Sequence, residues 1–189
     1  MRKRKHTHAG QGTAPLTGVT AWLSENKGII RFCVLFGVIL GAFTFLLDTD
    51  FLQQNFMSPH LKQVALCAGN IIQFFGTSCT VSETTIFSSR FSVNVVQGCD
   101  SIYPTAMLWA ALLAYPSTWK SKLIGITGGA AVLFIVNIIR IVTMFYIGMY
   151  VPSLFDMVHV YAWQALFILL TLAVWLIWAA KISRTPVNI

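Results

Sequence analysis

Long apolar stretches separated by short polar segments dominate the sequence. An α-helix needs about 20 apolar residues, within a range of roughly 17 to 25, to cross the hydrocarbon core of a bilayer. Four stretches reach this length: residues 29–47, 101–119, 123–150 and 160–180. The first contains only Arg31 and the third only Arg140 as a charged residue, and the other two contain none. The pattern therefore predicts four transmembrane helices.

A fifth apolar stretch, residues 61–75, has a different pattern. At the helical rotation of about 100° per residue, its polar and small positions fall on one narrow stripe and the remaining circumference is apolar. We expect a helix that lies on or dips into the outer membrane surface. The alternative is a true crossing followed by a second short one. The stripe consists of Lys62, Gln63, Gly69, Asn70 and Gln73.

Two shorter runs, residues 80–87 and 91–96, are rich in Val, Thr, Ile and Phe, and the second alternates apolar and polar positions. A Ser-Ser-Arg segment separates them. This pattern predicts a short β-hairpin. The fold class we expect is an all-α polytopic membrane protein with about four to six transmembrane helices and a small extracytoplasmic cap made of this hairpin and the surface helix.

Composition supports a membrane protein. Hydrophobic residues make up 56% of the 189-residue chain and charged residues only 10%, whereas soluble domains have about 25% charged residues. A soluble globular domain is thereby excluded, and 4 Cys are too few for a disulfide scaffold. The net charge of +7 comes from basic residues at the N-terminus and in short loops, which sets orientation in a bilayer and does not indicate nucleic acid as a partner.

The basic segments predict the topology. Residues 2–5, 120–122 and 181–184 carry most of the Lys and Arg outside the helices, and such segments stay on the cytoplasmic side. We expect residues 1–28 to form a disordered basic cytoplasmic tail and residues 29–182 the membrane domain, with an extracytoplasmic insert at about 48–98. A cleaved signal peptide is the alternative for the N-terminal region, but no small-x-small site follows the first apolar run.

Three residues whose side chains could take part in catalysis lie at the predicted outer ends of three helices. Arg140 is 17 residues beyond Leu123, about 26 Å along its helix, and a charge within a membrane helix indicates a functional site by default. Cys99 precedes the second helix, whose free amides and dipole favour a thiolate, and His159 precedes the last one. A thiolate, an imidazole and a guanidinium at one depth are the groups that nucleophilic acyl transfer requires.

Two further residues are expected to support this site. Asn137 lies three residues before Arg140 and shares its helix face, so it is placed to orient that residue. Asp100 or Ser101 can cap the second helix. The charge of Asp100 opposes a thiolate at Cys99, and a nearby Arg offsets this effect.

Each residue also has a purely structural explanation. Arg140 is the right length to snorkel to outer headgroups or to pair with Asp156 or Asp100, and a single His at a helix end is often only interfacial. Cys67 and Cys79 both fall in the outer insert, where they could form a disulfide.

Two other function classes stay open. One is a membrane thiol oxidoreductase that uses Cys67, Cys79 and Cys99 with a quinone. The other is a non-enzymatic assembly or transport subunit, with Arg140 as a structural or ion-pathway charge. The sequence contains no C-x-x-C, no zinc-type Cys/His spacing and no Gly-rich phosphate loop, so it predicts no cofactor and no metal site.

The ordered series of VVQGCDSI at 95–102, NIIRI at 137–141 and a His at 159 resembles the exosortase/archaeosortase family, most closely its exosortase H branch, over about residues 51–178. Members are integral-membrane cysteine transpeptidases. The resemblance implies that Cys99 is the nucleophile, His159 the general acid/base and Arg140 the stabiliser of the oxyanion or thiolate. One departure is the Asp-Ser pair after the Cys, where many members have Ser-Gly or another small pair.

The resemblance also implies the substrates and the location. The partners would be exported proteins whose C-terminal sorting signal combines a short motif, a transmembrane helix and a basic tail, together with membrane lipids. Cleavage would occur at the outer face of a bacterial plasma (inner) membrane, in a multi-pass enzyme whose active site faces the extracytoplasmic side, and the acyl group would pass to a surface acceptor.

Overall fold

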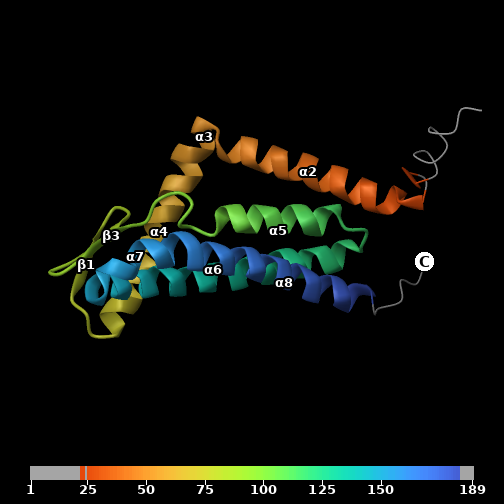
Figure 1. Cartoon of the computed structure of the whole chain (residues 1–189). Helices are drawn as coiled ribbons and strands as arrows, with labels where there is room; N and C mark the ends of the chain where they lie inside the picture. Colours follow the sequence, from red (N-terminus) through yellow and green to blue (C-terminus); the bar gives the residue numbers. More distant parts are fainter. Residues whose placement is uncertain (1–21, 24, 184–189) are drawn as a thin grey trace, which may run out of the picture.

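Four apolar helices lie side by side and form the body of the molecule (Figure 1): α2 (Lys27–Leu47), α5 (Ile102–Ala114), α6 (Trp119–Tyr150) and α8 (Trp163–Ser183). The computed structural model describes residues 22–23 and 25–183. Most of the predicted tail at 1–28 therefore lies outside the described residues, and α2 begins within its last two residues, at Lys27. Helix α5 contacts the other three, so it is the element around which the bundle is assembled.

Three segments of the described chain are long and apolar enough to cross a membrane: Lys27–Leu47, Trp119–Tyr150 and Pro152–Ile182. This confirms the expected fold class, a predominantly helical membrane protein with a small sheet. The third segment is not one regular helix. It consists of a 3₁₀ turn η2 (Pro152–Leu154), α7 (Phe155–Met157), a π-helical turn η3 (Val158–Ala162) and then α8.

Helix α5 is shorter than the predicted span at 101–119. Its 13 residues extend about 20 Å, less than the hydrocarbon thickness of about 30 Å. The helix ends at Ala114 because Pro116 sterically disfavours the helical conformation of the residue before it, and Tyr115 is accordingly extended with φ −73° and ψ 134°. The prediction was therefore wrong at this end, and Trp119 begins α6 instead.

A second helical layer crosses the end of the bundle. α3 (Asp50–Leu52), a π-helical turn η1 (Gln53–Met57) and α4 (Ser58–Phe74) follow one another, and α4 runs at a steep angle to the bundle helices (Figure 1). Helix α4 is not among the segments long and apolar enough to span a membrane. The helix predicted at 61–75 is therefore present, and its position on the outer membrane surface stays a prediction.

The predicted hairpin is a three-stranded antiparallel sheet in the order β1-β2-β3. The strands are β1 (Cys79–Ser82), β2 (Thr85–Ser88) and β3 (Ser92–Asn94). The expected turn between β2 and β3 is present. The prediction missed a second turn inside the first run, where Glu83 has a positive φ of 53° and divides the run into two strands.

The sheet docks on α4 through a close backbone approach. A Cβ atom added at Gly69 of α4 would collide with the side chain of Val81 in β1. Glycine at this position therefore allows the sheet to lie directly on the helix. The apolar core at this end joins α4, the sheet and α6: Val64, Ala65, Ala68, Ile72, Cys79, Ile86, Val95, Ile138, Ile141 and Phe145.

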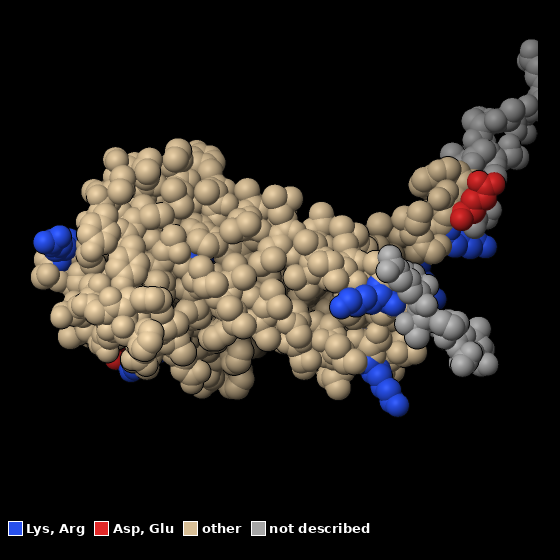
Figure 2. All heavy atoms as spheres, turned by 90° about the horizontal axis from the view of Figure 1, so that it is seen from below, with Lys and Arg blue, Asp and Glu red and all other residues tan. Residues whose placement is uncertain are grey.

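Charged side chains gather at the two ends of the molecule and leave a wide middle with almost no charged side chains on the face shown (Figure 2). The basic residues of α2 and α8, and those at the start of α6, lie at the end opposite the sheet, where α2 and α6 begin and α8 finishes (Figure 1). Near the sheet, Lys62 Nζ forms an ion pair with Glu83 Oε1 at 3.2 Å. The five basic residues at the opposite end are Lys27, Arg31, Lys120, Lys122 and Lys181.

Candidate active site

Cys99, Arg140 and His159 line one cavity of about 270 Å³ at the sheet end of the bundle. The three side chains come from the turn before α5, from α6 and from η3, respectively. The structure thus brings together all three residues that the sequence placed at one membrane depth.

The central contact joins the thiol and the imidazole. Cys99 Sγ lies 3.4 Å from His159 Nε2, which is hydrogen-bonding distance for sulfur. When the neutral imidazole carries its proton on Nδ1, Nε2 accepts the thiol proton. A nucleophile hydrogen-bonded to a base is the arrangement that activates a cysteine for attack on a carbonyl.

A tight turn presents Cys99 to the cavity. Gly98 has a positive φ of 89°, which glycine adopts at little cost. The amide of Cys99 donates to Val96 O at 2.9 Å, and the amide of Gly98 donates to Asp100 Oδ1 at 3.2 Å. Ser101 takes the N-cap position of α5 without a side-chain capping bond, so the capping predicted for it is not formed.

His159 is held by a π-helical turn and by aromatic neighbours. A π-turn inserts an extra residue into the helical repeat, and such turns occur frequently at functional sites. The ring of Phe155 lies 5.7 Å from the imidazole of His159, and the ring of Phe91 lies 5.6 Å from Phe155. Because Phe91 directly precedes β3, this aromatic chain couples the position of the imidazole to the sheet.

Arg140 is almost fully buried, with 8% of its surface exposed. Its guanidinium lies 5.5 Å from the ring centre of Phe167 in α8, a cation–π contact. Within the described residues no carboxylate lies at ion-pair distance from Arg140, which argues against simple pairing with Asp156 or Asp100. An arginine without a carboxylate partner remains available to a negative charge in the cavity.

Asp100 and Asn137 are both completely buried. Burial raises the pKa of the Asp100 carboxyl, and the hydrogen bond from the Gly98 amide opposes that shift. Asp100 Oδ2 and both polar side-chain atoms of Asn137 lack a hydrogen-bond partner among the described residues. Asn137 therefore forms no hydrogen bond to Arg140, and its orienting role stays a prediction.

The model of the family described as "Transmembrane exosortase (Exosortase_EpsH)" matches residues 11–176. The chain belongs to the transmembrane exosortase family. No curated protein and no solved structure matches it. The match to the family model begins well before residue 51, where the sequence resemblance was expected to start, and it includes all three residues of the Cys99 cavity.

The other cysteines of this exosortase are separate from the site. All four cysteines are free, with Cys67 exposed and Cys79 buried. The disulfide considered for these two residues is therefore not formed. The Cys79 thiol donates to Gly69 O at 3.6 Å, and burial raises its pKa while a hydrogen bond from Gln73 opposes the shift. No group of three or more potential metal ligands occurs in the part of the chain that the structure describes.

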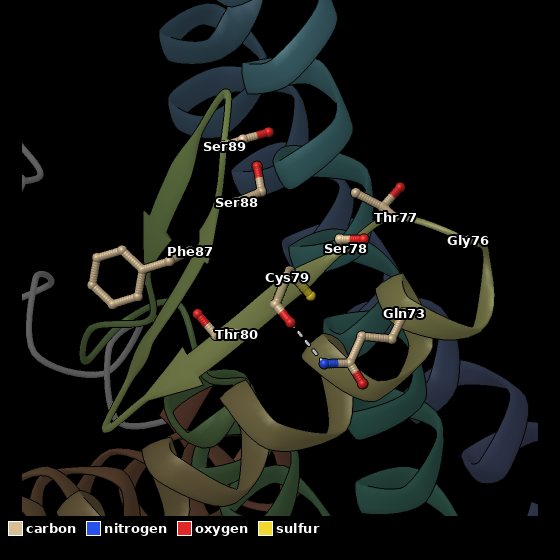
Figure 3. Close-up of a pocket in the computed structure, with 9 residues that line it drawn as sticks. All are labelled: Gln73, Gly76, Thr77, Ser78, Cys79, Thr80, Phe87, Ser88 and Ser89. Atoms are coloured by element: carbon tan, nitrogen blue, oxygen red, sulfur yellow. Dashed lines mark hydrogen bonds between the residues drawn. The ribbon is translucent and has the colours of Figure 1, made fainter.

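A larger hollow of about 690 Å³ lies between the end of α4 and strands β1 and β2 (Figure 3). Hydroxyl side chains dominate its lining, and Gln73 Nε2 donates to Cys79 O at 2.7 Å across one side. None of the predicted catalytic residues contributes to it. The hollow therefore has polar groups but lacks a nucleophile paired with a base.

Strand β3 and the residues beside it supply one wall of the Cys99 cavity. Residues 91–96 all line it, together with Ile141, Met144 and Phe155. The alternating pattern at 91–95 identified the strand, and its position a few residues before Cys99 was the available signal that the strand and the thiol are neighbours.

Proposed function

We propose that this exosortase is a cysteine transpeptidase that cleaves the C-terminal sorting signals of exported proteins. The observation that carries the proposal is the 3.4 Å contact between Cys99 Sγ and His159 Nε2, in a cavity that Arg140 also lines. The family is known for cysteine transpeptidases, and the Gly-Cys entrance to α5 favours the exosortase H branch.

The geometry supports the following reaction. His159 Nε2 takes the Cys99 proton, and the thiolate attacks the scissile carbonyl carbon. The carbonyl oxygen becomes an oxyanion, which Arg140 stabilises. When the intermediate collapses, the C–N bond breaks, the imidazolium donates its proton to the leaving amine, and a thioester remains on Cys99. An acceptor nucleophile then loses its proton to His159, attacks the thioester and releases the thiol.

The charge distribution supports an outward-facing site. Basic residues of membrane proteins concentrate on the cytoplasmic side, and the five Lys and Arg residues at the start of α2, the start of α6 and the end of α8 lie at the end opposite the sheet and Cys99. From this distribution we infer that the cavity faces the extracytoplasmic side of a bacterial plasma membrane. A substrate held by its own transmembrane helix and basic tail would present the preceding peptide at the same depth.

The decisive experiment is capture of the thioester. Membranes containing the full chain are quenched in acid, and peptides linked to Cys99 are identified by mass spectrometry. We expect a peptide from an exported protein, ending where its sorting signal is cut, and no adduct in Cys99→Ala. Absence of any adduct, together with normal substrate processing in Cys99→Ala, would overturn the proposal.

The thiol oxidoreductase alternative receives no support from the contacts. Disulfide exchange requires a second thiol within reach, whereas the partner of Cys99 is an imidazole and Cys67 and Cys79 are unpaired. We expect the double variant Cys67→Ser/Cys79→Ser to retain processing wherever it folds. Loss of processing in a folded double variant would favour redox chemistry instead.

A further inference from the structure

We propose that the peptide to be cleaved binds as an additional β-strand along the free edge of β3, next to Cys99. This inference rests on the proposed function, because it concerns how the substrate of that reaction is held. It identifies the recognition element as main-chain hydrogen bonds to an extended peptide.

The strand order leaves β3 with one unpaired edge. Strand β2 lies between β1 and β3, and it pairs with β3 through Ile86 opposite Val93. No other strand of the described chain pairs with β3. Such an edge presents unpaired amides and carbonyls, which are a template for another extended chain.

The register determines which groups face this edge. Val95 donates its amide to Thr84 O at 2.9 Å, and Ser88 donates its amide to Phe91 O at 2.9 Å. In an antiparallel pair, hydrogen-bonded and non-hydrogen-bonded positions alternate. Phe91, Val93 and Val95 therefore direct their main-chain groups to β2, and the intervening Ser92 and Asn94 direct theirs outward.

The Cys99 cavity follows the same edge. It touches all six consecutive residues from 91 to 96 and no residue of β1 or β2. Successive side chains of a strand point to opposite faces of a sheet. The cavity contacts side chains on both faces of β3 but none of β2, so it runs along the free edge of β3. Its remaining wall contains Cys99, Arg140 and His159, so a chain lying there passes the nucleophile.

The shape and lining of the cavity fit a peptide. Its volume of about 270 Å³ is below the range of roughly 300–1,000 Å³ for pockets that enclose drug-sized molecules, so it holds only a short stretch of extended chain. Within the lining, Arg140 is the residue with a fixed charge and no carboxylate is present. We therefore expect uncharged, small or apolar residues next to the cut site, because a basic side chain there would be repelled by Arg140 and left unpaired.

The test removes one outward amide of β3. Proline has no N–H and is tolerated at a sheet edge, so Ser92→Pro deletes the proposed donor. The matched variant Ser92→Ala retains the amide. The rate of Cys99 adduct formation on the native substrates is compared in the full chain in membranes. We expect Ser92→Pro to be about tenfold slower than Ser92→Ala, as for loss of one hydrogen bond. Equal rates would overturn the inference.

Thermal unfolding in detergent reports whether each variant still folds. If Ser92→Pro fails this check, hydrogen exchange of the unmodified chain decides. The amides of Ser92 and Asn94 should exchange rapidly in the free protein and become protected when the thioester-linked peptide is present. Unchanged exchange in a chain that carries the adduct would reject edge binding while leaving the proposed function intact. Complete absence of the adduct would reject the proposed function itself.

Discussion

At the scale of single residues, the proposed reaction would depend on the Cys99 sulfur, because no other thiol lines the cavity in the part of the chain that the structure describes. Cys99→Ala should lower substrate processing by at least about 1,000-fold, because the covalent path is lost. Immunoblotting of processed and unprocessed substrate in cells measures this. The half-exposed position of Cys99 on the cavity wall means that the variant should still insert at the wild-type level. Undiminished processing would exclude Cys99 as the nucleophile.

Arg140 combines its charge with a planar shape. Its guanidinium lies 5.5 Å from the ring centre of Phe167, and a Lys ammonium lacks both the flat surface and the fork of donors. Arg140→Lys should therefore lower the processing rate by about 100-fold, a typical cost for losing an oxyanion donor. The conservative change Arg31→Lys in α2 serves as the control and should have no effect. A fully active Arg140→Lys would reduce Arg140 to a point charge.

Asp100 should make the stability of the protein depend on pH. Burial raises the pKa of its carboxyl, so its contribution to stability is full below the pKa of the unfolded chain and is lost as the pH rises through the folded-state pKa. Asp100→Asn preserves an oxygen that accepts from Gly98 and removes the titration. Thermal unfolding in detergent should show the variant gaining over wild type as pH rises from acid to neutral. Parallel pH profiles would show that the carboxyl does not titrate in this range.

At the scale of elements, the active site depends on how the sheet docks on α4. A Cβ at position 69 would collide with Val81, so Gly69→Ala should destabilise the protein by about 1–3 kcal/mol, the usual cost of overpacking. Because β3 belongs to the same sheet, the processing rate should fall as well. Thermal unfolding and the processing assay measure the two effects.

Gly128→Ala in α6 is the matched control for this docking contact. A Cβ at position 128 meets nothing within 4 Å, and alanine favours a helix over glycine. This variant should be at least as stable as wild type. If both alanine variants behave alike, the close approach of α4 and β1 has no energetic importance.

The elements differ in how far local sequence specifies them. The end of α5 is specified locally, because Pro116 disfavours the helical conformation of the residue before it. The predicted span to residue 119 did not take this signal into account. The turn at Glu83 is less readable, since a glutamate with φ of 53° has no strong sequence signature. Helix α4 could be read from its helical periodicity, whereas its steep packing depends on its contacts with α6 and the sheet.

At the scale of the whole molecule, orientation decides which substrates reach the site. A membrane-impermeant maleimide added to intact cells should label Cys99, because the positive end of the bundle is predicted to face the cytoplasm. Mass spectrometry of the labelled peptides measures this. Lys120→Cys, at the opposite end, should react only after lysis. The reverse pattern would invert the topology and place the reaction on the cytoplasmic side.

The sequence by itself determined the membrane class, three of the long apolar segments and the three residues that the structure brings together in the Cys99 cavity. Moving a charged side chain into the membrane costs free energy, and moving apolar surface out of water releases it. Both quantities depend on the residue itself, so Arg140 could be singled out within an apolar segment before the fold was known. The tertiary structure decided that Cys99 and His159 meet at 3.4 Å, that Phe167 lies against Arg140 and that β3 forms the cavity wall. These contacts join residues distant in sequence, and only the packing of α4, α5, α6 and α8 with the sheet sets their separations.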